Sequence, residues 1–127
     1  MESRVLYVTG QPDDARELSR MLSPLRFRVD RAASVERARQ ELLAAEYDVV
    51  LTEAQLPDGK WLDVLHLVRD SSHAPAVIVT GRGLDPRFWA EALNLGAHDL
   101  LPQPFSEAEA QRIFSHAFVR QMYATTV

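Results

Sequence analysis

The sequence has no cysteine, and it lacks both a long apolar run and an excess of positive charge. Without cysteine the chain cannot form disulfides, use thiolate chemistry or hold zinc through sulfur, which fits a reducing compartment. Near the N-terminus only residues 5–8 are apolar in succession, far too few for a signal-peptide core or a membrane span. We therefore expect a cytoplasmic protein that does not engage a membrane.

The net charge and the length of the chain restrict the kind of protein further. Fourteen Lys and Arg residues against 18 Asp and Glu give a net charge of −4, so the chain lacks the cationic surplus that phosphate backbones attract. We expect no direct binding to nucleic acid. With 127 residues, of which 46% are hydrophobic and 25% charged, the sequence predicts one compact domain with a sizeable core.

Short apolar runs alternate along the chain with segments in which apolar residues recur with helical period. Nearly continuous apolar runs are typical of strands that helices cover on both faces. The alternation predicts an α/β fold with a doubly wound, five-stranded parallel sheet. The predicted strands centre on residues 5–8, 27–29, 49–51, 76–79 and 99–101.

Helix starts and the position of a site follow from this pattern. Pro12 or Asp13 can open the first helix, Ser34 can cap the second and Ser106 precedes the last. In a doubly wound sheet the site lies at the carboxyl ends of the strands. The segments that should form it are residues 9–11, 53–57, 80–82 and 102–104.

Four stretches within this pattern resemble the receiver domain of bacterial two-component response regulators, the fold of the chemotaxis response regulator. They are residues 8–18, 47–58, 77–81 and 96–105, in the order and spacing of that family. The resemblance covers the full length and implies a flavodoxin-like (βα)5 domain over residues 1–124. Residues 125–127 would be a tail or the start of a linker to an output domain.

The resemblance also implies a site that transfers a phosphoryl group to an aspartate with the help of Mg²⁺, two acids, a Thr or Ser and a Lys. At those places this chain has Thr9 and Gly10 for the acid pair, Glu53 for the acceptor and Gln103 for the lysine. Only Thr80, the switch hydroxyl, is retained. A carboxylate advanced by one methylene is badly placed for in-line displacement, and too few hard oxygens remain for Mg²⁺. We expect no metal, no cofactor and no enzymatic activity.

Two interpretations of Glu53 are open. It could mimic a phosphorylated aspartate by accepting a hydrogen bond from Thr80, or it could be drift, tolerated because it reaches water or donors such as Gln103 or Arg82. The nearby acids should not rebuild the site. Asp13 and Asp14 are expected a turn or more from the pocket, in a capping role, and Asp58 is expected to point to solvent.

Two further positions bear on switching. The resemblance implies a cis peptide bond between Gln103 and Pro104, which is a structural feature rather than a catalytic one. It also places Leu100 where the family has an aromatic ring that moves with the threonine. With that ring absent, the relay from the site to the surface should be cut.

The face formed by the fourth helix, the fifth strand and the fifth helix is the contact surface that the resemblance implies. Exposed aromatics with arginines are typical of interface hot spots. Phe88 and Trp89 are adjacent, so a helix should bury at most one of them well. Trp61 is a second exposed-aromatic candidate, which we expect to cover the pocket. The candidate interface residues are Arg87, Trp89, Arg112, His116 and Arg120.

Other functions have weaker support. His66, His73, His98 and His116 show no metal-binding spacing, and no glycine-rich phosphate loop follows the first strand. The sequence therefore favours a degenerate receiver that acts in signalling as a phosphorylation-independent interaction module. Its partners would be an output domain, a kinase or another receiver, including a second copy. The alternatives are a receiver still switched at Glu53 and a flavodoxin-like domain that binds a nucleotide or another small ligand.

Overall fold

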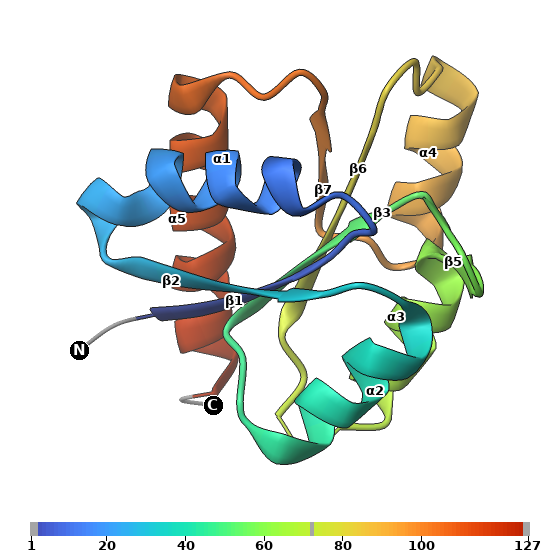
Figure 1. The fold of residues 1–127 in the computed structure, drawn as a ribbon, viewed down its shortest axis with the longest axis horizontal. Helices are drawn as coiled ribbons and strands as arrows, with labels where there is room; N and C mark the ends of the chain where they lie inside the picture. The colour runs from blue at the N-terminus through green and yellow to red at the C-terminus, as the bar shows by residue number, and fades with distance from the viewer. Residues whose placement is uncertain (1–2, 72, 126–127) are drawn as a thin grey trace.

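The computed structural model describes residues 3–71 and 73–125, with side chains described as far as Gln121. Strands and helices alternate from one end to the other (Figure 1). In chain order they are β1 (Ser3–Val8), α1 (Pro12–Leu22), the 3-10 helix η1 (Ser23–Leu25), β2 (Phe27–Ala32), α2 (Val35–Ala44), β3 (Val49–Glu53), β4 (Gln55–Leu56), β5 (Gly59–Lys60), α3 (Trp61–Arg69), β6 (Ala76–Gly81), α4 (Pro86–Leu95), β7 (Asp99–Pro102) and α5 (Glu107–Thr125).

The main sheet has five parallel strands in the order β2-β1-β3-β6-β7. β1 lies between β2 and β3, so the chain leaves β1 toward one edge and later returns to build the other. This change of direction defines a doubly wound sheet. The fold class predicted from the apolar runs is confirmed.

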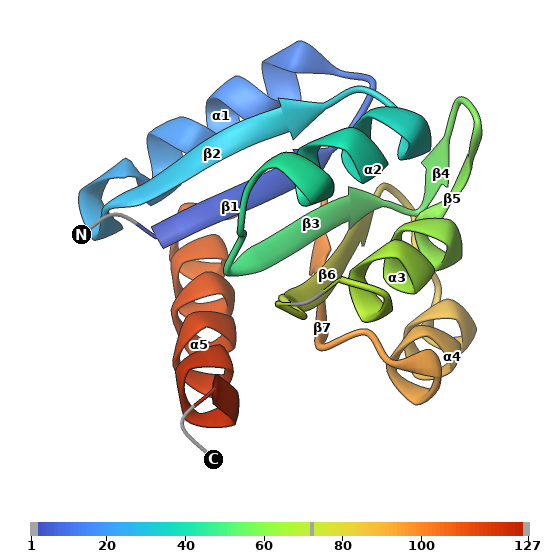
Figure 2. The same ribbon diagram turned by 90° about the horizontal axis from the view of Figure 1, so that it is seen from below.

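Helices cover both faces of this sheet (Figures 1 and 2). On one side α2, α3 and α4 pack over Leu6, Val50 and Val79, and on the other α1 and α5 pack over Val5 and Leu51. All five side chains are fully buried, because neighbouring residues of a strand point to opposite faces and both faces are covered. The polar side chains of the central strands are therefore confined to positions at or near the strand ends.

A two-stranded antiparallel hairpin, β4 with β5, follows β3 where the sequence predicted a loop. Its turn carries Asp58, which was expected simply to point to solvent. The side chain is exposed, but its two carboxylate oxygens accept hydrogen bonds from the backbone N–H groups of Val35 (2.8 Å) and Glu36 (3.1 Å) at the start of α2. Ser34 Oγ accepts from the Arg37 N–H at 3.1 Å, so the predicted cap is confirmed. The hairpin thus completes the capping of α2.

The prediction that Trp61 is an exposed cover for the pocket is wrong. Trp61 opens α3, retains only 4% of its accessible surface and packs edge-on against Phe88 of α4, with ring centroids 6.3 Å apart. The indole therefore joins two helices within the core. Trp89 also packs against this core, and both Phe88 and Trp89 are half-buried rather than one buried and one exposed.

α5 runs to Thr125, one residue beyond the predicted end, whereas Thr126 and Val127 of the predicted tail lie outside the described residues. In the part of the chain that is described, no helix is both long and apolar enough to cross a membrane.

Replacing Asp58 with Ala should lower the melting temperature, because two N–H groups of α2 lose their acceptor. Those hydrogen bonds lower the pKa of the Asp58 carboxyl. Its contribution is therefore present above the unfolded-state pKa, about 4, and is lost as the pH falls through the folded-state value. Thermal denaturation of wild type and D58A at neutral and acidic pH should show a gap that closes in acid. E46A, which removes an exposed acid without a described hydrogen bond, should show no such gap.

Candidate functional site

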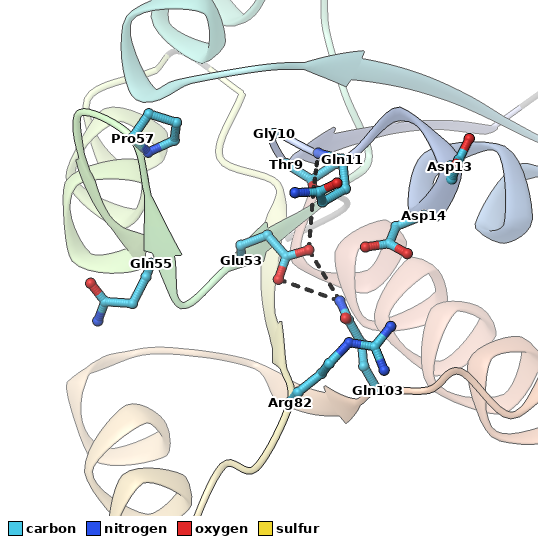
Figure 3. A pocket seen from close by; sticks show the side chains of 10 residues that line it. All are labelled: Thr9, Gly10, Gln11, Asp13, Asp14, Glu53, Gln55, Pro57, Arg82 and Gln103. Atoms are coloured by element: carbon cyan, nitrogen blue, oxygen red, sulfur yellow. Dashed lines mark hydrogen bonds between the residues drawn. The ribbon is translucent and has the colours of Figure 1, made fainter.

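The carboxyl ends of the strands meet at a cavity of about 560 Å³ (Figure 3). Thr9 follows β1, Glu53 ends β3, Arg82 follows β6 and Gln103 follows β7, and all four line this cavity. The register of β3 with β6 places Glu53 beside Thr80. The parallel sheet thus gathers at one edge the residues that the sequence singled out from four separate segments.

The Glu53 carboxylate is the centre of the site and accepts hydrogen bonds from three side chains. Its Oε1 accepts from the Tyr7 hydroxyl at 2.8 Å, from Thr9 Oγ1 at 3.1 Å and from Gln103 Nε2 at 3.1 Å. Gln103 Nε2 also lies 3.3 Å from Oε2 (Figure 3). Oε1 therefore already has three donors, and Oε2 is the less occupied oxygen.

All three donors are neutral, so they orient the carboxylate without cancelling its charge. Gln103 Nε2 also lies 3.1 Å from the Tyr7 hydroxyl oxygen, and the Gln11 N–H donates to Thr9 Oγ1 at 3.0 Å. These contacts hold the donors themselves in position. A carboxylate oxygen that takes three hydrogen bonds is poorly available as a nucleophile or as a metal ligand.

Tyr7 is the member of this network that sequence reasoning missed. It lies on β1, fully buried, with its ring edge-on to Phe105 at a centroid distance of 6.1 Å. Burial and, to a lesser extent, the Glu53 charge raise the pKa of the Tyr7 hydroxyl, so it stays protonated and acts as a donor. The available signal was a lone tyrosine within a buried aliphatic strand, since a buried phenol requires a hydrogen-bond partner.

Thr80 does not make the hydrogen bond to Glu53 that the mimic interpretation required. It is fully buried, and its hydroxyl donates to the Leu101 carbonyl of the neighbouring strand at 2.6 Å. The amide of Gln103 binds Glu53 instead, as the drift interpretation anticipated, and Arg82 makes no described hydrogen bond to it. Leu100, at the place of the expected aromatic, is fully buried.

The expectation that Asp13 and Asp14 lie away from the cavity is wrong, because both line it. α1 begins at Pro12, so these residues occupy its first turn, directly at the cavity mouth, and neither is the N-cap, which is Gln11. Figure 3 shows Asp14 directed toward the cavity and Asp13 directed away from Glu53. Asp13 is paired with Arg16.

The acidic residues that line the cavity nevertheless do not form a metal-binding cluster. Among the described residues, no three His, Asp or Glu side chains come close enough together to hold a metal ion. The peptide bond between Gln103 and Pro104 is cis, as the sequence predicted.

The residues of the predicted contact surface lie on α4 and α5. Arg87, Arg112, His116 and Arg120 are exposed, and Trp89 is half-buried. The structure adds a contact that sequence spacing did not indicate, since the rings of His98 and His116 lie 5.3 Å apart between centroids.

Comparison with known proteins agrees with this architecture. The model of the response regulator receiver domain matches residues 5–114. The chain is 35% identical to the transcriptional regulatory protein CpxR of Escherichia coli over 103 residues, spanning 76% of this chain and 43% of CpxR. A signal receiver domain of an HD domain-containing protein from Pseudomonas fluorescens superposes with a TM-score of 0.85 at 25% identity, covering 98% of this chain and 93% of that one.

A further solved structure, the beryllofluoride-activated receiver domain dimer of NtrC4, has a TM-score of 0.84 at 24% identity, covering 93% of this chain and 98% of that one. The chain belongs to the response regulator receiver domain family, and so to two-component signal transduction. It spans less than half the length of CpxR.

Removing the Tyr7 hydroxyl should destabilise the fold by about 1 kcal/mol, because Glu53 loses a buried donor. This loss of folding stability should depend on the presence of the Glu53 carboxylate. A double-mutant cycle of Y7F and E53A, in which each single variant removes one partner, followed by urea denaturation, should give a coupling energy of about 0.5–1.5 kcal/mol. Additive effects would show that the Tyr7–Glu53 contact contributes nothing to stability.

Proposed function

We propose that this receiver domain is a pseudo-receiver, a protein-interaction module that works without aspartyl phosphorylation. The observation that carries the proposal is the state of Glu53, whose Oε1 accepts from Tyr7, Thr9 and Gln103. These donors hold Oε1 and fix the orientation of the carboxylate, and Thr9, Gly10 and Gln103 take the places of the acid pair and the lysine that would bind the metal and the phosphoryl group. The hydrogen bonds from these neutral donors hold the Glu53 side chain in one position without a ligand.

The charge pattern supports the same conclusion. Phosphoryl transfer to a carboxylate requires cations that offset the charge of the acceptor and of the incoming group. Arg82 is the cationic residue among those that line the cavity, against Glu53, Asp13 and Asp14. A dianionic phosphoryl group would enter a site of the same charge sign, while a cation would meet carboxylates that point in different directions.

The wild-type chain should give no saturable change in its amide NMR spectrum when Mg²⁺ and then beryllofluoride are added. The residues to follow are Thr9, Glu53, Thr80 and Gln103. Saturable, Mg²⁺-dependent shifts centred on them would overturn the proposal in favour of a receiver that is still switched. Acetyl phosphate with mass spectrometry would then show whether a covalent adduct forms on Glu53.

A restored variant provides the matched control. It combines T9D, G10D, E53D and Q103K, and a Cβ at Gly10 would meet only Pro57 Cγ at 3.9 Å, so the added aspartate has room. This variant should respond to Mg²⁺ and beryllofluoride under the conditions in which the wild type is silent. The contrast would assign the silence to those positions rather than to the fold.

For the contact surface we propose α4 and α5, with Arg87, Trp89, Arg112, His116 and Arg120 as the residues that meet an output domain, a kinase or a second receiver. Arg87 is exposed, and Trp89 keeps part of its ring accessible beside it. The NtrC4 receiver, a structural neighbour, forms a dimer when activated by beryllofluoride. A site that needs no activation would leave such a surface permanently available.

If two copies pair through this surface, R87E should weaken self-association by about tenfold, since it reverses a charge at the contact. Sedimentation velocity over a concentration series measures this directly. R16E reverses an exposed arginine on α1, outside the proposed surface, and should leave association unchanged. Equal sedimentation of R87E and wild type would remove this face as a homodimer interface.

A further inference from the structure

A second cavity, of about 520 Å³, lies at the edge of the sheet opposite to Glu53. Its walls come from the end of α3, the start of β6, the connection from α4 to β7, and the last turns of α5. Figure 1 shows α5 running back along the sheet, so its later turns lie beside the amino ends of β6 and β7. The cavity is within the size range of small-molecule sites.

The described residues that line this cavity include four basic side chains and no acidic one, in a chain whose net charge is −4. The basic residues are Arg69, His98, His116 and Arg120. Neither arginine forms an ion pair with the described residues. A cavity lined by basic side chains and by no described acid favours an anionic ligand.

The four groups are arranged by the fold. His116 and Arg120 lie one turn apart on α5 and so share a face, and His116 stacks at a tilt on His98, with ring centroids 5.3 Å apart. Arg69 donates to the Leu95 carbonyl at 2.6 Å and passes over Gly96, where a Cβ would collide with its guanidinium. Gly96, with a φ of +124°, therefore lets α3 present an arginine at the cavity.

His98 provides an independent sign that a partner is missing. Its Nε2 is buried and has no hydrogen-bond partner among the described residues. Burial lowers the pKa of His98, His116 and Arg120 lower it further, and Asp99 opposes them. A buried ring nitrogen without a hydrogen-bond partner is costly.

We infer that this cavity binds a small phosphate-bearing molecule, with Arg120, His116 and Arg69 contacting the phosphate beside His98. An arginine guanidinium can donate two hydrogen bonds to a phosphate group. A phosphate dianion also interacts more strongly with two arginines than a single carboxylate does. Leu65, Val68 and Pro75 add apolar surface that can contact an organic body. The inference does not depend on the proposed state of the Glu53 site, because the two cavities share no residue, whereas His116 and Arg120 also belong to the proposed contact surface.

Amide NMR titrations of the full chain with inorganic phosphate, glucose 6-phosphate and citrate, at constant ionic strength, test the inference. Saturable shifts of Ala97, His98 and His116 with a phosphate compound are expected. Tighter binding of glucose 6-phosphate than of phosphate would indicate an organic ligand, and the reverse would indicate the free ion. Linear shifts with every compound, or citrate binding as tightly as both phosphates, would overturn the inference.

Matched variants separate a site from general attraction between charges. R120Q should weaken phosphate binding by about tenfold or more, since a charge-assisted hydrogen bond is lost. R20Q removes the same charge from an exposed position of α1 outside the cavity lining and should bind as the wild type does. Equal losses in the two variants would overturn the inference, and thermal denaturation of both checks that the fold is retained.

Discussion

Burial of the parallel sheet on both faces is the constraint on which the rest of this structure depends. Strands covered on both sides have little room for polar side chains, and the fully buried polar residues, Thr9, Thr52 and Thr80, all lie at or near strand ends. Chemistry is therefore confined to the two edges where strands begin or end. The carboxyl edge holds the Glu53 site and the amino edge holds the basic cavity.

At the carboxyl edge, buried polarity is satisfied internally. Tyr7, Thr9 and Gln103 come from β1 and from the segments after β1 and β7, and all donate to one oxygen of Glu53. Receiver chemistry requires a carboxylate that can exchange water for a metal ion and a phosphoryl group. Here hydrogen bonds from neutral side chains of the protein occupy Oε1 of Glu53 and order the site.

The amino edge shows the opposite situation. Its basic side chains are brought together by α3, α5 and the turn into β7, yet the described part of the chain supplies no acid to the lining and no partner for His98 Nε2. Among the described residues, Glu53 at the carboxyl edge thus has hydrogen-bond partners in the protein, whereas His98 Nε2 at the amino edge has none. If both proposals hold, the domain would take its input at the edge where receivers have no phosphorylation site.

Much of the fold could be predicted from the sequence, because burial on both faces leaves continuous apolar runs such as residues 49–51, and helix faces leave a 3.6-residue period. The four segments of the Glu53 site followed from the same reasoning, whereas Gln103 was only one of several partners left open for Glu53. The β4–β5 hairpin, which caps α2 with Asp58, could not be predicted, since its strands are only two residues long. The burial of Trp61 depends on Phe88 of α4.

The sequence by itself determined the fold class and the identity of the residues at each strand end, because both follow from local patterns of burial. Only the tertiary structure decided which of those residues touch. Tyr7 and Glu53 are 46 positions apart, and Gln103 lies 50 positions beyond Glu53. Arg69, His98 and Arg120 likewise meet only because three segments end at the same edge of the sheet. Such contacts depend on how elements pack, and packing is not encoded in the spacing of residues along one segment.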